Sequence, residues 1–139
     1  MKKFLFACVH NAGRSQMAAA FFNQLADLNL AQAISAGTRP GEQVHPVVVT
    51  IMREAGIDLS HARPQLLTDA LAREAEMLIT MGCGEACPHI PGLRREDWPL
   101  PDPKTMPVEE ARAVRDAIRQ HVRDLLAREG CGEQQKRGC

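Results

Sequence analysis

The stretch that decides the fold is residues 3–15, which read KFLFACVHNAGRS. Lys3–Val9 is a short apolar run of Phe, Leu and Val, typical of a strand that is buried on both faces of a parallel sheet. His10–Gly13 interrupts this run. Apolar residues then recur at helical spacing, at Met17, Phe21, Leu25 and Leu28. The stretch therefore predicts a strand, a tight loop and a helix that carries its apolar face as far as Leu28.

Strands and helices alternate along the rest of the chain. Further strands are expected at Ala33–Ala36, Glu76–Met81 and Arg94–Leu100, and further helices at Pro46–Ala55, at Thr68–Ala75 and from Pro107 onward. This alternation predicts one α/β domain with a parallel sheet. Sites in such sheets lie beyond the carboxyl ends of the strands, so the loops after Val9, Ala36 and Met81 should meet at one edge. The turn at Asp102 should lie at the same edge.

Composition excludes several classes of function. The 139 residues carry 17 basic and 17 acidic side chains, and this balance argues against a general nucleic-acid binder. Only 4% of the residues are aromatic, which argues against base-stacking platforms. The apolar stretch Phe4–Val9 is far shorter than the roughly 20 residues that span a membrane, and it is too short for a signal peptide. We therefore expect a cytoplasmic protein, monomeric, with no nucleic-acid or membrane partner.

The loop from Cys8 to Ser15 has the residues of an oxyanion site. A helix N-terminus offers unpaired N–H groups and a positive dipole, which bind an anion and favour the thiolate form of Cys8. The planar guanidinium of Arg14 can hold two oxygens of a tetrahedral oxyanion. Ser15 is placed to donate to the sulfur, Asn11 to hold the loop, and Gly13 to permit a close approach or a positive φ. The candidate oxyanion-binding residues are Val9, His10, Asn11, Ala12, Gly13, Arg14 and Ser15.

The sequence Cys8-x5-Arg14-Ser15 near the N-terminus resembles the low-molecular-weight protein tyrosine phosphatase superfamily, and more narrowly the arsenate reductases built on that fold. Further similar segments follow in the same order at Ser35–Thr38, Gly56–Ser60, Met81–Cys83, Asp97–Trp98 and Leu100–Pro103. The resemblance implies a flavodoxin-like α/β fold with a four-stranded parallel sheet flanked by helices. It reaches to about Glu129, so we expect a domain over residues 1–129 and a mobile tail over residues 130–139.

The resemblance also implies catalytic roles. Cys8 would be the nucleophile, Arg14 would clamp the oxyanion, and Asp102 would handle the proton on a departing oxygen. Arsenate has the shape and charge of phosphate, so phosphate and sulfate should compete for the loop. A phosphatase would hydrolyse its phosphocysteine with water, and this is the main alternative. Lys104, however, stands where such phosphatases usually carry an aromatic residue that lines the substrate slot.

Reduction of arsenate needs a second thiol that attacks the Cys8 sulfur. By the resemblance, Cys83 resolves the adduct, and Cys87 attacks next and moves the disulfide to the Cys83–Cys87 pair. No bound cofactor is expected. An external reductant would restore the thiols, either thioredoxin or glutathione or mycothiol with a glutaredoxin-like protein. Only three residues separate Cys83 from Cys87, a spacing more similar to the branch in which a small thiol resolves the Cys8 adduct directly, and both routes stay open.

Two other interpretations use the same cysteines. The spacing Cys83-x3-Cys87-x-His89 would suit three zinc ligands, but no fourth ligand lies nearby in the sequence, so no metal site is predicted. A thiol-based sensor of arsenite or metals is the alternative of another class, and it would need neither the Arg14 clamp nor Asp102. Cys131 and Cys139 fall in the expected tail, and we expect them to take no part in the reaction.

Overall fold

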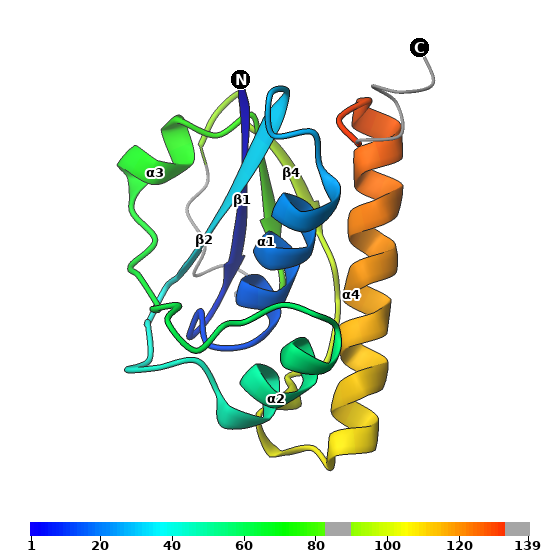
Figure 1. The fold of residues 1–139 in the computed structure, drawn as a ribbon. Coiled ribbons are helices and arrows are strands. Elements are labelled where there is room, and N and C mark those ends of the chain that lie inside the picture. The colour runs from blue at the N-terminus through cyan, green and yellow to red at the C-terminus, as the bar shows by residue number, and fades with distance from the viewer. Residues whose placement is uncertain (83–89, 133–139) are drawn as a thin grey trace.

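The computed structural model of the chain describes residues 1–82 and 90–132 (Figure 1). Its strands are β1 (Lys2–Cys8), β2 (Ala31–Gly37), β3 (Met77–Thr80) and β4 (Arg94–Asp97). Its helices are α1 (Arg14–Leu25), α2 (Pro46–Glu54), α3 (Asp69–Arg73) and α4 (Val108–Glu129), with a short 3-10 helix, η2 (Pro103–Thr105). The strand order is β2-β1-β3-β4 and every neighbouring pair is parallel. The predicted four-stranded parallel sheet is confirmed.

Helices cover both faces of the sheet, and β1 shows how the sequence specifies this. Its side chains alternate, so that Phe4 and Phe6 lie in the larger core beneath α1, α2 and α4. Leu5 and Ala7 point to the opposite face, where they pack in a smaller cluster that includes Ala72 of α3. Figure 1 shows α3 on one side of the sheet and the long α4 on the other. Burial on both faces explains why the strand reads as a continuous apolar run.

The first helix is shorter than its apolar spacing predicts. Helix α1 ends at Leu25, and Leu28 is 53% exposed instead of completing the buried face. The reason is a turn at Asp27, whose carboxylate accepts a hydrogen bond from the backbone N–H of Asn29 over 3.0 Å. Such Asx turns compete with helix continuation. The expectation that the helix carries its apolar face to Leu28 was wrong.

The packed body continues past the boundary expected at Glu129. Gly130 ends α4 in the left-handed conformation, with φ of +67°. Cys131 is only 2% exposed, its carbonyl accepts from the backbone N–H of Asp27 over 2.9 Å, and Gly132 forms a bridge with Ala26. The expectation that a mobile tail begins at residue 130 was therefore wrong for residues 130–132. Residues 133–139 lie outside the described part. Within residues 1–82 and 90–132, no helix is long and apolar enough to cross a lipid bilayer.

The parallel register brings four chain segments to one edge. Cys8 at the end of β1 pairs with Gly37 at the end of β2. On the other side of β1, Ala7 pairs with Thr80, and Thr80 pairs with Asp97 at the end of β4. The carboxyl ends of the four strands therefore lie at one edge of the sheet, beside the N-terminus of α1, as the alternation of elements predicts.

Candidate active site

Cys8 stands where β1 ends and the loop to α1 begins. Its side chain is buried, with 3% exposure, and its sulfur lies 2.8 Å from Ser15 Oγ in the first turn of α1. The amide nitrogen of Asn11 donates to the same Ser15 oxygen over 2.8 Å. Both Asn11 and Ser15 are fully buried. Asn11 and Ser15, which the sequence assigned to loop support, thus form a chain of hydrogen bonds that ends at the sulfur.

The direction of these hydrogen bonds is fixed by the backbone. The N–H of Gln65, which can only donate, lies 2.9 Å from Asn11 Oδ1, so the amide nitrogen of Asn11 must face Ser15. Ser15 Oγ accepts from Asn11, and its single hydrogen is therefore available for the sulfur of Cys8. The series of donors ends on the sulfur and favours a negative charge there.

The loop carbonyls point away from the loop centre. Those of Val9, His10 and Ala12 accept from the backbone N–H groups of Arg39, Gly41 and His45 over 2.8–2.9 Å. Because each peptide is planar and trans, the N–H group of the following residue points the opposite way. The loop N–H groups thus gather on the inner side next to the N-terminus of α1. Such a set of N–H groups forms an anion-binding nest.

Arg14, the first residue of α1, is held in place by the loop after β4. Its Nη1 donates to the carbonyl of Leu100 over 2.9 Å, and its Nη2 lies 3.8 Å from Asp102 Oδ2. The Arg14 side chain is only 12% exposed. Asp102 is itself fixed, because its Oδ1 accepts from the backbone N–H of Lys104 over 3.0 Å. The structure therefore brings Asp102 beside Arg14, as the sequence predicts.

Two glycines make close approaches for which sequence reasoning gave no reason. A Cβ at Gly37 would lie 2.6 Å from the carbonyl oxygen of Val9 and 2.9 Å from the backbone nitrogen of Asn11. A Cβ at Gly82, where φ is +89°, would lie 2.5 Å from Arg14 Nη1. Glycine at the end of a strand is a known sign of close backbone approach. That sign was present in the sequence, but the partners could be found only in three dimensions.

The positive φ in the loop belongs to Asn11 and not to Gly13. Asn11 has φ of +51°, whereas Gly13 has φ of −142°. Asn adopts the left-handed region more readily than most residues, and its buried side-chain bonds hold it there. The imidazole Nδ1 of His10 lies 3.0 Å from the carbonyl of Arg39, so this side chain ties the loop to the segment after β2.

His45, which its place before Pro46 predicts to be a surface or cap residue and not a catalytic one, lies against the loop. It caps the start of α2, and its ring carbon Cδ2 would be 3.4 Å from a Cβ at Gly13. Burial lowers the pKa of His45, opposed by the negative charge of Asp102 and assisted by the positive charge of Lys104. The ring is therefore neutral at neutral pH.

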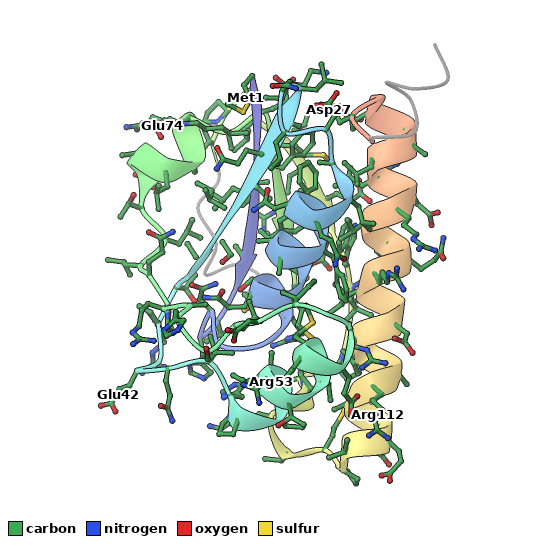
Figure 2. The ribbon with its side chains drawn as sticks, viewed as in Figure 1. Met1, Asp27, Glu42, Arg53, Glu74 and Arg112 are labelled. Atoms are coloured by element: carbon green, nitrogen blue, oxygen red, sulfur yellow. The ribbon has the colours of Figure 1, made fainter. Side chains whose placement is uncertain are left out.

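The other thiols divide into two groups. Cys83 and Cys87, together with His89 and Cys139, lie outside the described residues. Cys131 lies at the opposite end of β1 from Cys8. Its carbonyl accepts from the N–H of Asp27, and the turn from Asp27 to Leu30 is hydrogen-bonded to Lys2 at the start of β1. Figure 2 shows Asp27 and Met1 at one end of the molecule and Arg53 of α2 at the other. Burial also raises the pKa of the Cys131 thiol, which keeps it protonated at neutral pH.

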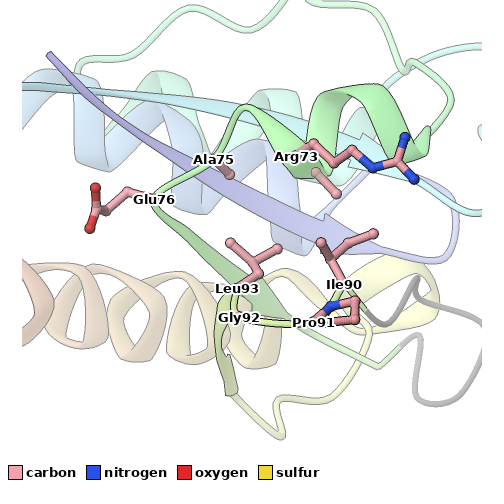
Figure 3. A pocket seen from close by; sticks show the side chains of 8 residues that line it. Arg73, Ala75, Glu76, Ile90, Pro91, Gly92 and Leu93 are labelled. Carbon is pink, nitrogen blue, oxygen red and sulfur yellow. The ribbon is translucent and has the colours of Figure 1, made fainter.

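A separate pocket lies between the end of α3 and the segment that leads into β4 (Figure 3). Its volume is about 370 Å³, and Arg73 and Glu76 are the charged residues in its lining. The lining residues are Ala72, Arg73, Ala75, Glu76, Ile90, Pro91, Gly92 and Leu93. None of them belongs to the Cys8 loop, so this pocket is distinct from the oxyanion site.

Comparison with known proteins decides the family. The sequence pattern described as "Low molecular weight phosphotyrosine protein phosphatase" matches residues 3–136. The chain belongs to this phosphatase family. The match includes the whole Cys8 loop and the Asp102 turn, and it extends beyond Glu129, where the sequence analysis placed the end of the resemblance.

The relatives of this phosphatase-family chain are named for another reaction. It is 34% identical to the "Glutaredoxin arsenate reductase" of Synechocystis sp., over 92% of this chain and 98% of the relative. It is 31% identical to an "Arsenate reductase" of Staphylococcus aureus, over 91% of this chain and 98% of the relative. The solved "thioredoxin-dependent arsenate reductase" of Corynebacterium glutamicum is 38% identical, with a TM-score of 0.78. That match covers 91% of this chain and 61% of the solved one.

Proposed function

We propose that this chain reduces arsenate to arsenite, and that arsenic detoxification is its role. The loop N–H groups and Arg14 bind the tetrahedral oxyanion. The sulfur of Cys8, supported by the Ser15 hydroxyl at 2.8 Å, is the nucleophile. The near full-length similarity to proteins named arsenate reductases supports this choice of substrate.

In the first step the thiolate of Cys8 attacks arsenic. A sulfur–arsenic bond forms and one arsenate oxygen leaves. Asp102, which lies 3.8 Å from Arg14, supplies the proton that lets this oxygen leave as hydroxide or water. Arsenic is still pentavalent in the adduct.

In the second step another thiolate attacks the sulfur of Cys8. A disulfide forms, the sulfur–arsenic bond breaks, and its electron pair stays on arsenic, which leaves as arsenite. Two thiols are thereby oxidised and one arsenic is reduced by two electrons. We propose Cys83 as the attacking thiol, followed by Cys87, after which a thioredoxin or a glutaredoxin-like protein restores the thiols.

The observation that carries the proposal is the contact between Gly82 and Arg14. Gly82 lies so close to the guanidinium that a Cβ would be 2.5 Å from Nη1, and the next residue in the sequence is Cys83. A phosphatase has no use for a second thiol directly after a residue that touches its oxyanion clamp. Lys104 beside Asp102, in place of an aromatic residue, gives no support for an aryl phosphate slot.

The test is one turnover without an external reductant. Reduced protein is mixed with arsenate, arsenite is quantified, and intact and peptide masses are recorded. The proposal expects one arsenite per chain and a loss of two hydrogen masses, with a bridge between Cys8 and Cys83 or between Cys83 and Cys87. A mixed disulfide on Cys8 that forms only with added glutathione or mycothiol would support the small-thiol route. Neither product, together with hydrolysis of an aryl phosphate, would assign the chain to the phosphatases.

Cys83→Ser is expected to abolish multiple turnover with a dithiol reductant, because the hydroxyl cannot form a disulfide. Oxyanion binding should stay intact, since Cys83 does not belong to the Cys8 loop. Steady-state arsenite release and calorimetric binding of phosphate measure the two properties. Unchanged turnover would contradict the internal relay.

Cys131→Ser is expected to leave arsenate turnover unchanged. Cys131 lies at the far end of β1, about 20 Å from Cys8 for a seven-residue strand. The substitution should cost roughly 1 kcal/mol of unfolding free energy, because it places a hydroxyl in a buried site. Denaturant unfolding and steady-state kinetics measure both effects. A loss of turnover that exceeds the loss of folded protein would place Cys131 in the thiol relay.

A further inference from the structure

Gln16, the third residue of α1, lies directly behind the catalytic loop. It is only 7% exposed. Its amide nitrogen lies 3.1 Å from the carbonyl oxygen of Asn11, 3.2 Å from Asn11 Oδ1 and 3.2 Å from the carbonyl oxygen of Arg63. The two hydrogens of one amide group are thus shared among three oxygens, and all three belong to segments that surround Cys8.

These contacts meet a need of the loop. Asn11 holds φ of +51°, a conformation that costs a residue with a side chain about 1 kcal/mol. Asn11 is fully buried, and its carbonyl oxygen accepts a hydrogen bond from the amide of Gln16 over 3.1 Å. Gln16 therefore stabilises the strained residue on which the loop depends.

The third contact reaches the segment that orients Asn11. Arg63, whose carbonyl accepts from Gln16, is two residues from Gln65, whose N–H donates to Asn11 Oδ1. Gln16 thus holds Asn11 and, at the same time, the segment that supplies its orienting donor. The hydrogen bond from the Gln65 N–H to Asn11 Oδ1 directs the Asn11 amide toward Ser15. Loss of the Gln16 amide would remove a contact that holds Asn11 and a contact that holds the segment of Gln65.

We propose that Gln16 is a positioning residue for Cys8. Its amide fixes Asn11 and the Arg63–Gln65 segment, so that the Ser15 hydroxyl is directed at the sulfur and the thiolate is favoured. Gln16 touches neither the sulfur nor the oxyanion, and it acts through Asn11 and Ser15. The kinetic consequence rests on the proposed function, whereas the consequence for the reactivity of Cys8 does not.

The test is alkylation of Cys8 by iodoacetamide in Gln16→Met, which keeps the length of the side chain and removes both donors. The modified Cys8 peptide is quantified by mass spectrometry at pH 7 and at pH 10. We expect the rate at pH 7 to fall about three- to tenfold, as the loss of a buried hydrogen bond predicts. The difference from the parent should disappear at pH 10, where hydroxide can remove the thiol proton without help from the Ser15 hydroxyl. With arsenate, kcat/KM should fall by a similar factor.

The matched control is Gln24→Met, at an exposed glutamine of the same helix. It should react like the parent at both pH values. Fluorescence of Trp98, which is buried in the core, reports whether each variant is folded. If Gln16→Met does not fold, Gln16→Ala removes the same donors without adding a charge or an acceptor, and it should give the same loss at pH 7.

Two results would overturn the proposal. One is an unchanged rate at pH 7 in a folded Gln16 variant. The other is an equal loss at both pH values, which would indicate altered access to the thiol and not a smaller thiolate fraction. A loss confined to pH 7 in a protein whose parent does not reduce arsenate would sustain the positioning role and reject the proposed function. A parent that reduces arsenate beside a variant of normal reactivity would reject the positioning role alone.

Discussion

Cys8→Ser is expected to reduce arsenate turnover by about 1000-fold or more, because serine stays protonated at neutral pH and cannot form a disulfide. The buried surroundings should tolerate the change, since Ser15 Oγ lies 2.8 Å from the sulfur and can bond to the new hydroxyl. Binding of phosphate should persist, because the loop N–H groups and Arg14 are untouched. Arsenite release and calorimetric phosphate binding measure the two outcomes separately.

Cys131→Ser is the matched control for this substitution, since it makes the same change at the other buried cysteine of the described residues. Residual turnover of Cys8→Ser above a few per cent of the parent would mean that another group attacks arsenic. Loss of phosphate binding would mean that the sulfur itself, and not the N–H groups, carries the affinity for oxyanions.

Gly82→Ala is expected to raise the KM for arsenate by about 10- to 100-fold, the value of a charged hydrogen bond of 1.5–3 kcal/mol. The new Cβ would lie 2.5 Å from Arg14 Nη1 and 3.1 Å from its Cζ, so the guanidinium must leave its position beside Leu100 and Asp102. Because the clamp is displaced, binding of phosphate should weaken by a similar factor. Steady-state kinetics and phosphate titration provide the measurement.

Gly56→Ala separates the clash from the backbone strain. Gly56 has nearly the same positive φ as Gly82, +84° against +89°, but a Cβ there meets nothing within 4 Å. Both variants should lose about 1–2 kcal/mol of unfolding free energy from the left-handed conformation. Only Gly82→Ala should change KM, and equal kinetic effects in the two variants would show that strain alone, and not the position of Arg14, controls substrate binding.

The sequence predicts those features of the site that are contiguous in the chain. Cys8, Asn11, Arg14 and Ser15 follow one another between a strand and a helix, so the periodicity of the flanking elements places them together. The meeting of the strand ends and the Asp102 turn at one edge also follows, because parallel strands deliver their carboxyl ends to one edge.

Features that depend on contacts between distant segments could not be predicted from the sequence. Gln65 reaches Asn11 across 54 positions and Leu100 reaches Arg14 across 86. No local pattern signals these pairs. Leu28 shows the opposite error, because its spacing suits a helix while the Asx turn at Asp27 ends that helix first. Cys131 was assigned to a mobile tail because the local sequence shows no periodicity. Its burial comes from contacts with the distant segment around Asp27, which the sequence does not reveal.

The outward carbonyls of the Cys8 loop have a consequence for selectivity. Neighbouring backbone N–H groups already bind the carbonyls of Val9, His10 and Ala12. The entropy of ordering the inner N–H groups is therefore lost when the chain folds and not when the oxyanion binds. A rigid cradle of this kind measures size and charge, and phosphate and arsenate share both. Discrimination must then arise after capture, from the readiness of arsenic to accept an electron pair when its bond to sulfur breaks. The protein would exclude phosphate by the chemistry of the second step and not by the strength of the first encounter.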